Sequence, residues 1–181
     1  MTKKELRRQL LSLRASLGKD KQREFSKQIW ENVEKLEEFK KANKIGVYLD
    51  FGSEVKTFSY LEKLTRKKEI FVPRLRGKEM DFVRFNGPEG LKAGAYGILE
   101  PIEGKICPPE ELELILAPGL GFTLEGGRLG YGGGYYDKYL TQTRAAVFAL
   151  AFEIQILDKL PIESWDYPLD GLISEKTSYR F

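Results

Sequence analysis

The segment LELILAPGLGFTLEGGRLGYGGGYYDKYL, residues 112–140, narrows the choice of fold more than any other part of the chain. Its first six residues, LELILA, are apolar except for Glu113, which is typical of a strand buried on both faces of a sheet. Pro118 and Gly119 end this run, and a glycine-rich stretch continues to Gly134. A short helix is expected at about residues 135–142. A strand, a glycine-rich loop and a helix in this order favour an α/β protein with a mainly parallel sheet.

The rest of the chain shows the same alternation of apolar strands and amphipathic helices. Residues 86–109 are the exception, because glycine and proline interrupt them and predict little regular structure. The expected helices are 2–17, 20–42 and 57–68, and the expected strands are 45–49, 70–73, 80–85, 145–152 and 172–174. Internal repeats, low-complexity tracts and linkers are absent, so residues 1–181 are expected to form a single domain.

The first expected helix is amphipathic and basic. Its apolar stripe has helical spacing and consists of Leu6, Leu10, Leu13 and Leu17. The basic side chains are assigned to the remaining faces and are Lys3, Lys4, Arg7, Arg8 and Arg14. A basic surface of this kind is most often simply solvated.

The composition excludes several kinds of catalytic site. The chain contains no histidine and a single cysteine, Cys107, which is expected to be structural. Histidine-containing triads, histidine-ligated zinc or iron, multi-cysteine zinc sites and internal disulfides are therefore excluded. Any chemistry would rely on carboxylates, lysine, arginine, tyrosine, backbone amides or an oxygen-ligated metal such as Mg²⁺.

The charge balance and hydropathy indicate a cytoplasmic protein. The net charge is only +3, which gives no indication of a dedicated nucleic-acid or membrane partner. The sequence has no apolar stretch long enough for a signal peptide or a membrane span. Small molecules are therefore the expected partners, and the sequence predicts no particular oligomeric state.

The glycine-rich loop is the strongest candidate for a binding site. Glycines permit positive φ angles and let a ligand approach the backbone amides, and Arg128 could add a charge-assisted contact to a phosphate. The loop lacks the Rossmann fingerprint, which would require a glycine at Tyr135, and the P-loop, which would require Lys-Ser or Lys-Thr at residues 133–134. A flexible turn before a helix is the structural alternative.

The sequence RLGYGGGYYD, residues 128–137, followed by KYL, resembles the signature of the 5-formyltetrahydrofolate cyclo-ligase family, also called methenyltetrahydrofolate synthetases. The preceding APGLGF, residues 117–122, is also similar to that family, and the resemblance covers nearly the whole chain. It implies that the loop binds ATP and folate. It also implies catalytic roles for Arg128 and Asp137, with Asp137 as a ligand of Mg²⁺.

The resemblance assigns two overlapping sets of residues to the substrates. The ATP-binding set is Lys3, Lys4, Glu5, Leu6, Arg7, Arg128, Leu129, Gly130, Tyr131, Gly132, Gly133, Gly134, Tyr135 and Tyr136. The folate-binding set is Leu49, Glu54, Tyr131, Gly132, Gly133, Gly134 and Tyr135.

Glu54 has a chemical reason to bind a folate. A pterin presents an exocyclic amine beside a ring N–H, and one carboxylate can accept both hydrogen bonds. The structural alternative is a surface glutamate in a helix-capping loop. The resemblance also implies that Asp170, in WDYPLDGLISE at residues 165–175, is a second Mg²⁺ ligand. An aspartate before glycine is also a common turn former.

Three further features bear on the resemblance. Arg74 or Arg76 could meet a phosphate or the glutamate tail of folate. Gly133 occupies a position where some members of the family have lysine, so Arg128 and the N-terminal basic residues would have to supply that charge. Trp165 occupies a position where many members have histidine, so no role of that histidine carries over.

The family reaction that the resemblance implies requires no protein nucleophile. The formyl oxygen on N5 attacks the γ-phosphate of ATP, and N10 then attacks the activated carbon, which yields 5,10-methenyltetrahydrofolate, ADP and phosphate. Such a reaction depends on positioning and charge neutralisation by Mg²⁺ and by cationic groups. The resemblance also implies a three-layer α/β/α sandwich. Candidates to wall the pterin ring are Phe51, Tyr96 and Tyr135.

Two other functions are compatible with parts of the sequence. An ATP-dependent kinase or ligase for another small anionic metabolite would use the same loop and metal but would not require Glu54. An RNA-binding module would use the basic first helix and the Gly-Tyr loop as a stacking platform, but the nearly balanced charge disfavours it.

Overall fold

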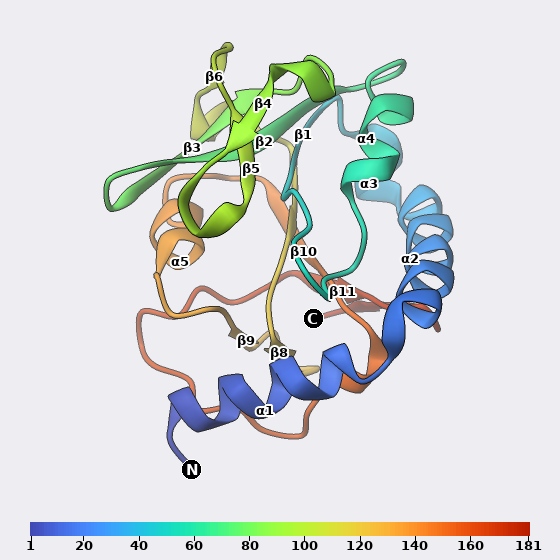
Figure 1. The fold of residues 1–181 in the computed structure, drawn as a ribbon, viewed down its shortest axis with the longest axis vertical. Helices are drawn as coiled ribbons and strands as arrows, with labels where there is room; N and C mark the ends of the chain where they lie inside the picture. Colours follow the sequence, from blue (N-terminus) through green and yellow to red (C-terminus); the bar gives the residue numbers. More distant parts are fainter.

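The computed structural model of the protein describes residues 1–181. Its centre is an eight-stranded sheet in the order β12-β11-β10-β7-β1-β2-β3-β6 (Figure 1). The strands of this sheet are β1 (Lys44–Val47), β2 (Glu69–Arg76), β3 (Glu79–Arg84), β6 (Ile106–Cys107), β7 (Leu114–Ala117), β10 (Ala146–Leu150), β11 (Gly171–Ile173) and β12 (Ser178–Arg180). Two short ladders lie outside the sheet and pair β4 (Leu91–Ala93) with β5 (Leu99–Pro101) and β8 (Gly121–Phe122) with β9 (Arg128–Leu129).

The sheet is mainly parallel, as the sequence predicts. The five strands β2, β1, β7, β10 and β11 run parallel, and Ile45 of β1 is in register with Ile70 of β2 and Leu114 of β7. The antiparallel strands β3, β6 and β12 extend the sheet at its two edges. The carboxyl ends of the parallel strands therefore share one edge, where ligands of α/β proteins are usually bound.

Helices cover both faces of the sheet. They are α1 (Lys3–Ala15), α2 (Gly18–Lys35), α3 (Glu37–Lys41), α4 (Phe58–Leu64) and α5 (Tyr135–Leu140). Leu114 and Leu116 of β7 pack in the core beneath α2, α3 and α4, whereas Ile115 packs on the other face with Leu140 of α5. Burial on both faces explains the continuous apolar strands. The predicted three-layer α/β fold is confirmed, although its second helical layer contains only the short α5.

Two predictions of secondary structure were wrong. The expected helix 20–42 is divided into α2 and α3, because Leu36 has an extended backbone (φ −69°, ψ 130°). This break lets both Leu36 and Phe39 enter the core. The expected irregular region 86–109 contains β4, β5 and β6, and the final strand β12 was not predicted. These strands have only two or three residues each, which is too short for a periodicity to be recognised.

The helix α1 crosses the molecule beside the β8–β9 ladder, at the carboxyl edge of the sheet (Figure 1). Its Leu10 is buried with Leu120 and Leu129, and the three residues form a small separate core. The loop after β1 and the glycine-rich loop after β7 emerge at the same edge. None of the helices combines the length and apolar character needed to cross a bilayer.

Candidate active site

The helix α1 brings the basic N-terminal segment to the glycine loop. Thr2 and Glu5 form a reciprocal capping box that begins the helix. Further along the helix, Arg7 Nε donates a hydrogen bond to the carbonyl oxygen of Gly130 at 2.9 Å. Leu6 packs against the small core that contains Leu129. Residues assigned to ATP from distant parts of the chain are therefore adjacent in the structure.

The other N-terminal side chains have different surroundings. Lys3 forms ion pairs with Asp166 at 3.3 Å and Glu163 at 3.5 Å, and Lys4 is exposed. The carboxylate of Glu5 is used in the capping box. Arg7 is therefore the charged ATP residue predicted on α1 whose side chain reaches the loop directly.

The glycine loop adopts backbone conformations that favour glycine. Gly132 has φ +104° and Gly134 has φ +72°, which is a left-handed residue immediately before α5. Tyr135 donates a hydrogen bond to Gly77 O at 3.1 Å and so connects the loop to the β2–β3 turn. A Cβ atom at Gly133 would lie 2.8 Å from the Tyr135 ring. A lysine at this position would therefore require the Tyr135 side chain to move.

Arg128 and Asp137 form a largely buried ion pair beneath the loop. Arg128 Nη2 lies 3.1 Å from Asp137 Oδ1, and the two side chains are 5% and 20% exposed. Arg128 Nη1 also donates to Pro118 O, while the Tyr167 amide donates to the same Asp137 oxygen. The buried Nε of Arg128 has no hydrogen-bond partner. The pair joins β9, α5 and the segment around residue 167.

Glu54 is buried rather than displayed on the surface. Its residue is 7% exposed, and Asp50 instead accepts the amide hydrogen bonds of Thr57 and Phe58 at the start of α4. The structural alternative, a surface glutamate in a helix-capping loop, is therefore wrong about the surface, although the loop does cap α4 through Asp50. The Tyr131 hydroxyl donates to Glu54 Oε1 at 2.5 Å, and the Phe51 amide donates to Oε2 at 2.7 Å.

Burial determines the protonation behaviour of this pair. Burial raises the pKa of Glu54, and the hydrogen bonds from Tyr131 and Phe51 only partly oppose it. Burial and the nearby Glu54 charge raise the pKa of Tyr131, so Tyr131 stays a neutral hydrogen-bond donor. Each carboxylate oxygen of Glu54 retains a second lone pair, so the group can accept two further hydrogen bonds from a ligand.

Arg14 is a site residue that the sequence analysis missed. It was assigned to a solvent-facing side of the first helix, but its residue is only 2% exposed. Its Nε donates to Ser53 Oγ at 3.0 Å, and its Nη1 donates to Gly119 O at 3.2 Å. The spacing of Arg14 with Leu10 and Leu17 would have indicated a buried face, because residues three and four apart share a side of a helix.

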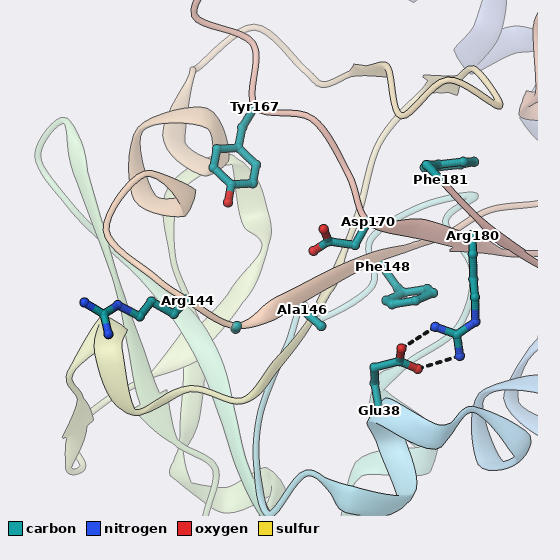
Figure 2. Close-up of a pocket in the computed structure, with 9 residues that line it drawn as sticks. Glu38, Arg144, Ala146, Phe148, Tyr167, Asp170, Arg180 and Phe181 are labelled. Atoms are coloured by element: carbon teal, nitrogen blue, oxygen red, sulfur yellow. Dashed lines mark hydrogen bonds and ion pairs between the residues drawn. The ribbon is translucent and has the colours of Figure 1, made fainter.

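Asp170 lies at the amino-terminal end of the parallel strands, opposite the end from which the glycine loop emerges. It directly precedes β11, and its Oδ2 accepts the amide hydrogen bond of Val147 near the start of β10. Figure 2 shows Asp170 beside a cavity of about 520 Å³ that also contains the Glu38–Arg180 ion pair. This cavity is distinct from the cluster of Glu54, Tyr131 and Arg14. No group of three or more acidic or cysteine side chains is arranged to hold a metal ion.

The remaining predicted residues have varied environments. Leu49 is buried in the main core, so its side chain is not available to a ligand. Phe51 is half exposed, and a Cβ atom at Gly97 would lie 3.8 Å from its ring. Tyr96, at the tip of the β4–β5 hairpin, is 79% exposed with φ +60°. Arg76 forms surface ion pairs with acidic neighbours on β3, and Cys107 is buried in the core.

Comparison with known proteins gives the same family throughout. Residues 1–175 match the model of the 5-formyltetrahydrofolate cyclo-ligase family. A 5-formyltetrahydrofolate cyclo-ligase from Haemophilus influenzae is 28% identical over 94% of this chain and 96% of its own length. The enzyme of the same name from Mus musculus is 30% identical over 96% of this chain and 93% of its own.

Two solved structures are similar to the whole fold. A 5,10-methenyltetrahydrofolate synthetase from Aquifex aeolicus is 37% identical, with a TM-score of 0.91 over 99% of this chain and 93% of its own. A 5,10-methenyltetrahydrofolate synthetase from Mycoplasma pneumoniae is 25% identical, with a TM-score of 0.78 over 97% of this chain and 99% of its own.

Proposed function

The chain belongs to the 5-formyltetrahydrofolate cyclo-ligase family, and we propose that its active site lies between the Glu54 loop and the glycine loop. The protein catalyses the ATP-dependent cyclisation of 5-formyltetrahydrofolate to 5,10-methenyltetrahydrofolate. The other functions compatible with parts of the sequence, a different kinase or ligase and an RNA-binding module, do not account for a family match over residues 1–175.

The observation that carries the placement of the site is the buried carboxylate of Glu54 beside the glycine loop. A buried carboxylate is costly unless it is hydrogen-bonded, and Glu54 has only the donors Tyr131 and Phe51 in the free protein. The donor pair of a pterin would complete its hydrogen bonding in two parallel bonds. Phe51 and Tyr135 are the proposed walls for the pterin ring, with Tyr96 on the β4–β5 hairpin.

ATP is proposed to lie along the glycine loop from residue 128 to 136. Arg7 contacts the loop at Gly130 and lies close to Gly132. Its positive charge is therefore next to glycine backbone amides that a phosphate could approach. Arg128 lies beneath the loop and has an unpartnered Nε. These groups would offset negative charge on the phosphates while the formyl oxygen is phosphorylated.

Magnesium fits Asp137 through the oxygen that the protein leaves free. Oδ1 of Asp137 accepts hydrogen bonds from Arg128 and Tyr167, whereas Oδ2 has no protein partner. Mg²⁺ commonly takes one or two carboxylates and completes its coordination with substrate phosphates and water. A bound Mg²⁺ would neutralise phosphate charge. We do not propose Asp170 as a second ligand of the same ion, because its hydrogen bond to Val147 is at the other end of the parallel strands.

The proposed site is tested by separating folate binding from ATP binding. The assay follows formation of the methenyl product by absorbance, with and without Mg-ATP, in the wild type and in Glu54→Gln. We expect Glu54→Gln to weaken binding of 5-formyltetrahydrofolate while ATP binding stays at the wild-type level. If the affinities for ATP and folate fell equally, or if neither fell, Glu54 would not bind the pterin.

The protein is proposed to be cytoplasmic, and cell fractionation would test this location.

A further inference from the structure

Arg14 is a buried cation without a carboxylate partner. Its residue is 2% exposed, and its guanidinium forms no ion pair with an aspartate or glutamate. Its hydrogen bonds go to neutral oxygens, those of Ser53 and Gly119. Burial of an unpaired charge is costly, and an apolar residue would suit the packed face of a helix better. The arginine is therefore not explained by stability.

The contacts of Arg14 connect the three parts of the proposed site. Ser53 belongs to the loop that carries Glu54, and Gly119 begins the glycine-rich segment after β7. The guanidinium carbon also lies 5.9 Å from the centre of the Tyr131 ring. The planar guanidinium of Arg14 thus contacts the loop that carries Glu54, the start of the glycine-rich segment and Tyr131, which donates to Glu54.

Arg14 is also the cation that acts on the buried Glu54. The groups that face Glu54 from the packed elements are Tyr48, Asp50, Tyr131, Tyr136 and Arg14. Asp50 raises the pKa of Glu54, whereas the positive charge of Arg14 lowers it against the larger effect of burial. The nearby Lys56 pairs with Asp50 at 3.5 Å.

We propose that Arg14 is a positioning residue for the cyclo-ligase reaction, which holds the loop that carries Glu54 against the glycine loop and against Tyr131, the hydrogen-bond donor to Glu54. This inference rests on the proposed role of Glu54 in folate binding. It requires no direct contact between Arg14 and either substrate. The charge of Arg14 and its hydrogen bonds are separable, because lysine retains the first and glutamine can retain part of the second.

The test compares Arg14→Gln, Arg14→Lys and the matched control Arg8→Gln, in which an exposed arginine of the same helix is changed. Binding of 5-formyltetrahydrofolate without ATP and kcat/KM for this substrate are measured across the acid range of pH. We expect Arg14→Gln to move the acid limb of both profiles upward by about one pH unit, because a nearby opposite charge typically shifts a carboxyl by this much or more. At the wild-type midpoint this shift lowers the ionised fraction of Glu54 from one half to about one eleventh, so KM should rise about fivefold, with kcat changed much less.

The remaining variants distinguish charge from general damage. Arg14→Lys should leave the acid limb at the wild-type pH, because it keeps the positive charge. KM should still rise several-fold, because the guanidinium hydrogen bonds to Ser53 and Gly119 are lost. Glu54→Gln should abolish the acid limb, and adding Arg14→Gln to it should cause no further shift. An unchanged limb in folded Arg14→Gln, or a displaced limb in Arg14→Lys, would overturn the role of Arg14. If Glu54→Gln kept the limb and bound folate normally, the proposed role of Glu54 would fail as well.

Discussion

At the scale of single residues, the site places ionisable groups where burial alone would disfavour them. Glu54 is buried against the hydroxyl of Tyr131 rather than against a cation at ion-pair distance. Arg128 is buried with one donor, Nε, left without a partner. Buried carboxylates without a close cation, and buried donors without a partner, are uncommon in folded proteins and are concentrated at functional sites. The roles assigned to these residues therefore make distinct predictions about stability and activity.

Glu54→Gln should lower activity without lowering stability. Because burial raises the pKa of Glu54 above its unfolded value, the stability that its protonated form provides is lost as pH rises through the folded pKa. The substituted glutamine is uncharged, so the melting temperature at neutral pH should stay the same or increase. Loss of charge-assisted hydrogen bonds worth about 3 kcal/mol should lower kcat/KM for folate about a hundredfold.

Calorimetry and steady-state kinetics on one preparation measure both effects of Glu54→Gln. A melting temperature several degrees lower, with a normal KM for folate, would instead identify Glu54 as a purely structural residue.

Asp137→Ala should destabilise the protein as well as inactivate it. It would leave the Arg128 guanidinium, which is 5% exposed, without its carboxylate. Breaking a buried ion pair in this way typically costs about 3–5 kcal/mol, and the partial exposure of Asp137 places the expected loss at about 2–3 kcal/mol. Asp137→Asn keeps an acceptor for Arg128 and should be more stable than the alanine variant. Chemical denaturation with a Mg²⁺ titration of activity separates the two effects, and equal stability of both variants would contradict the structural part.

At the scale of elements, the glycine loop depends on α1 and α5 for its conformation. Arg7 of α1 binds the carbonyl of Gly130, and Gly134 enters α5 through a left-handed backbone. Tyr135 fastens the start of α5 to the β2–β3 turn. Two adjacent glycines of the loop have different physical reasons for being glycine.

Gly134→Ala and Gly133→Ala should therefore have different effects. Gly134 has φ +72° with open space around its Cβ position, so alanine should cost about 1 kcal/mol through backbone strain alone. At Gly133 the added Cβ would lie 2.8 Å from the Tyr135 ring, so alanine should displace Tyr135 and raise KM for both substrates. Thermal unfolding and substrate KM values test this pair. The argument fails if Gly133→Ala is kinetically normal.

At the scale of the whole molecule, the site depends on a sheet whose central strands are so closely packed that an added methyl group would clash. Gly46 lies in β1, at the middle of the sheet, and its Cβ position is 2.8 Å from the ring of Phe82 in β3. The loop that carries Glu54 begins directly after β1. Packing of the centre and placement of the loop that carries Glu54 are therefore coupled.

Gly46→Ala should destabilise the fold by about 1–3 kcal/mol, because overpacking a dense core forces its side chains from their preferred rotamers. Gly90→Ala is the matched control, since nothing lies within 4 Å of its Cβ position. It should leave the free energy of unfolding nearly unchanged. Urea denaturation of the two variants provides the comparison, and similar midpoints would contradict the steric argument.

The sequence by itself determined the α/β class, the mainly parallel sheet and the family. Continuous apolar strands require burial on both faces, and the motif at residues 128–137 combines many constrained positions in a short segment. These are local signals, because each depends on residues that are neighbours in the chain. The short strands β4, β5, β6 and β12 gave no such signal.

Only the tertiary structure decided which residues share a site. Glu54 meets Tyr131 across 77 positions of sequence, and Arg14 meets Gly119 across 105. It also separated Asp170 from the carboxyl edge of the sheet, since Asp170 precedes a parallel strand instead of following one. The physical reason is that burial and charge–charge distance depend on packing between distant elements, which no local pattern of residues records.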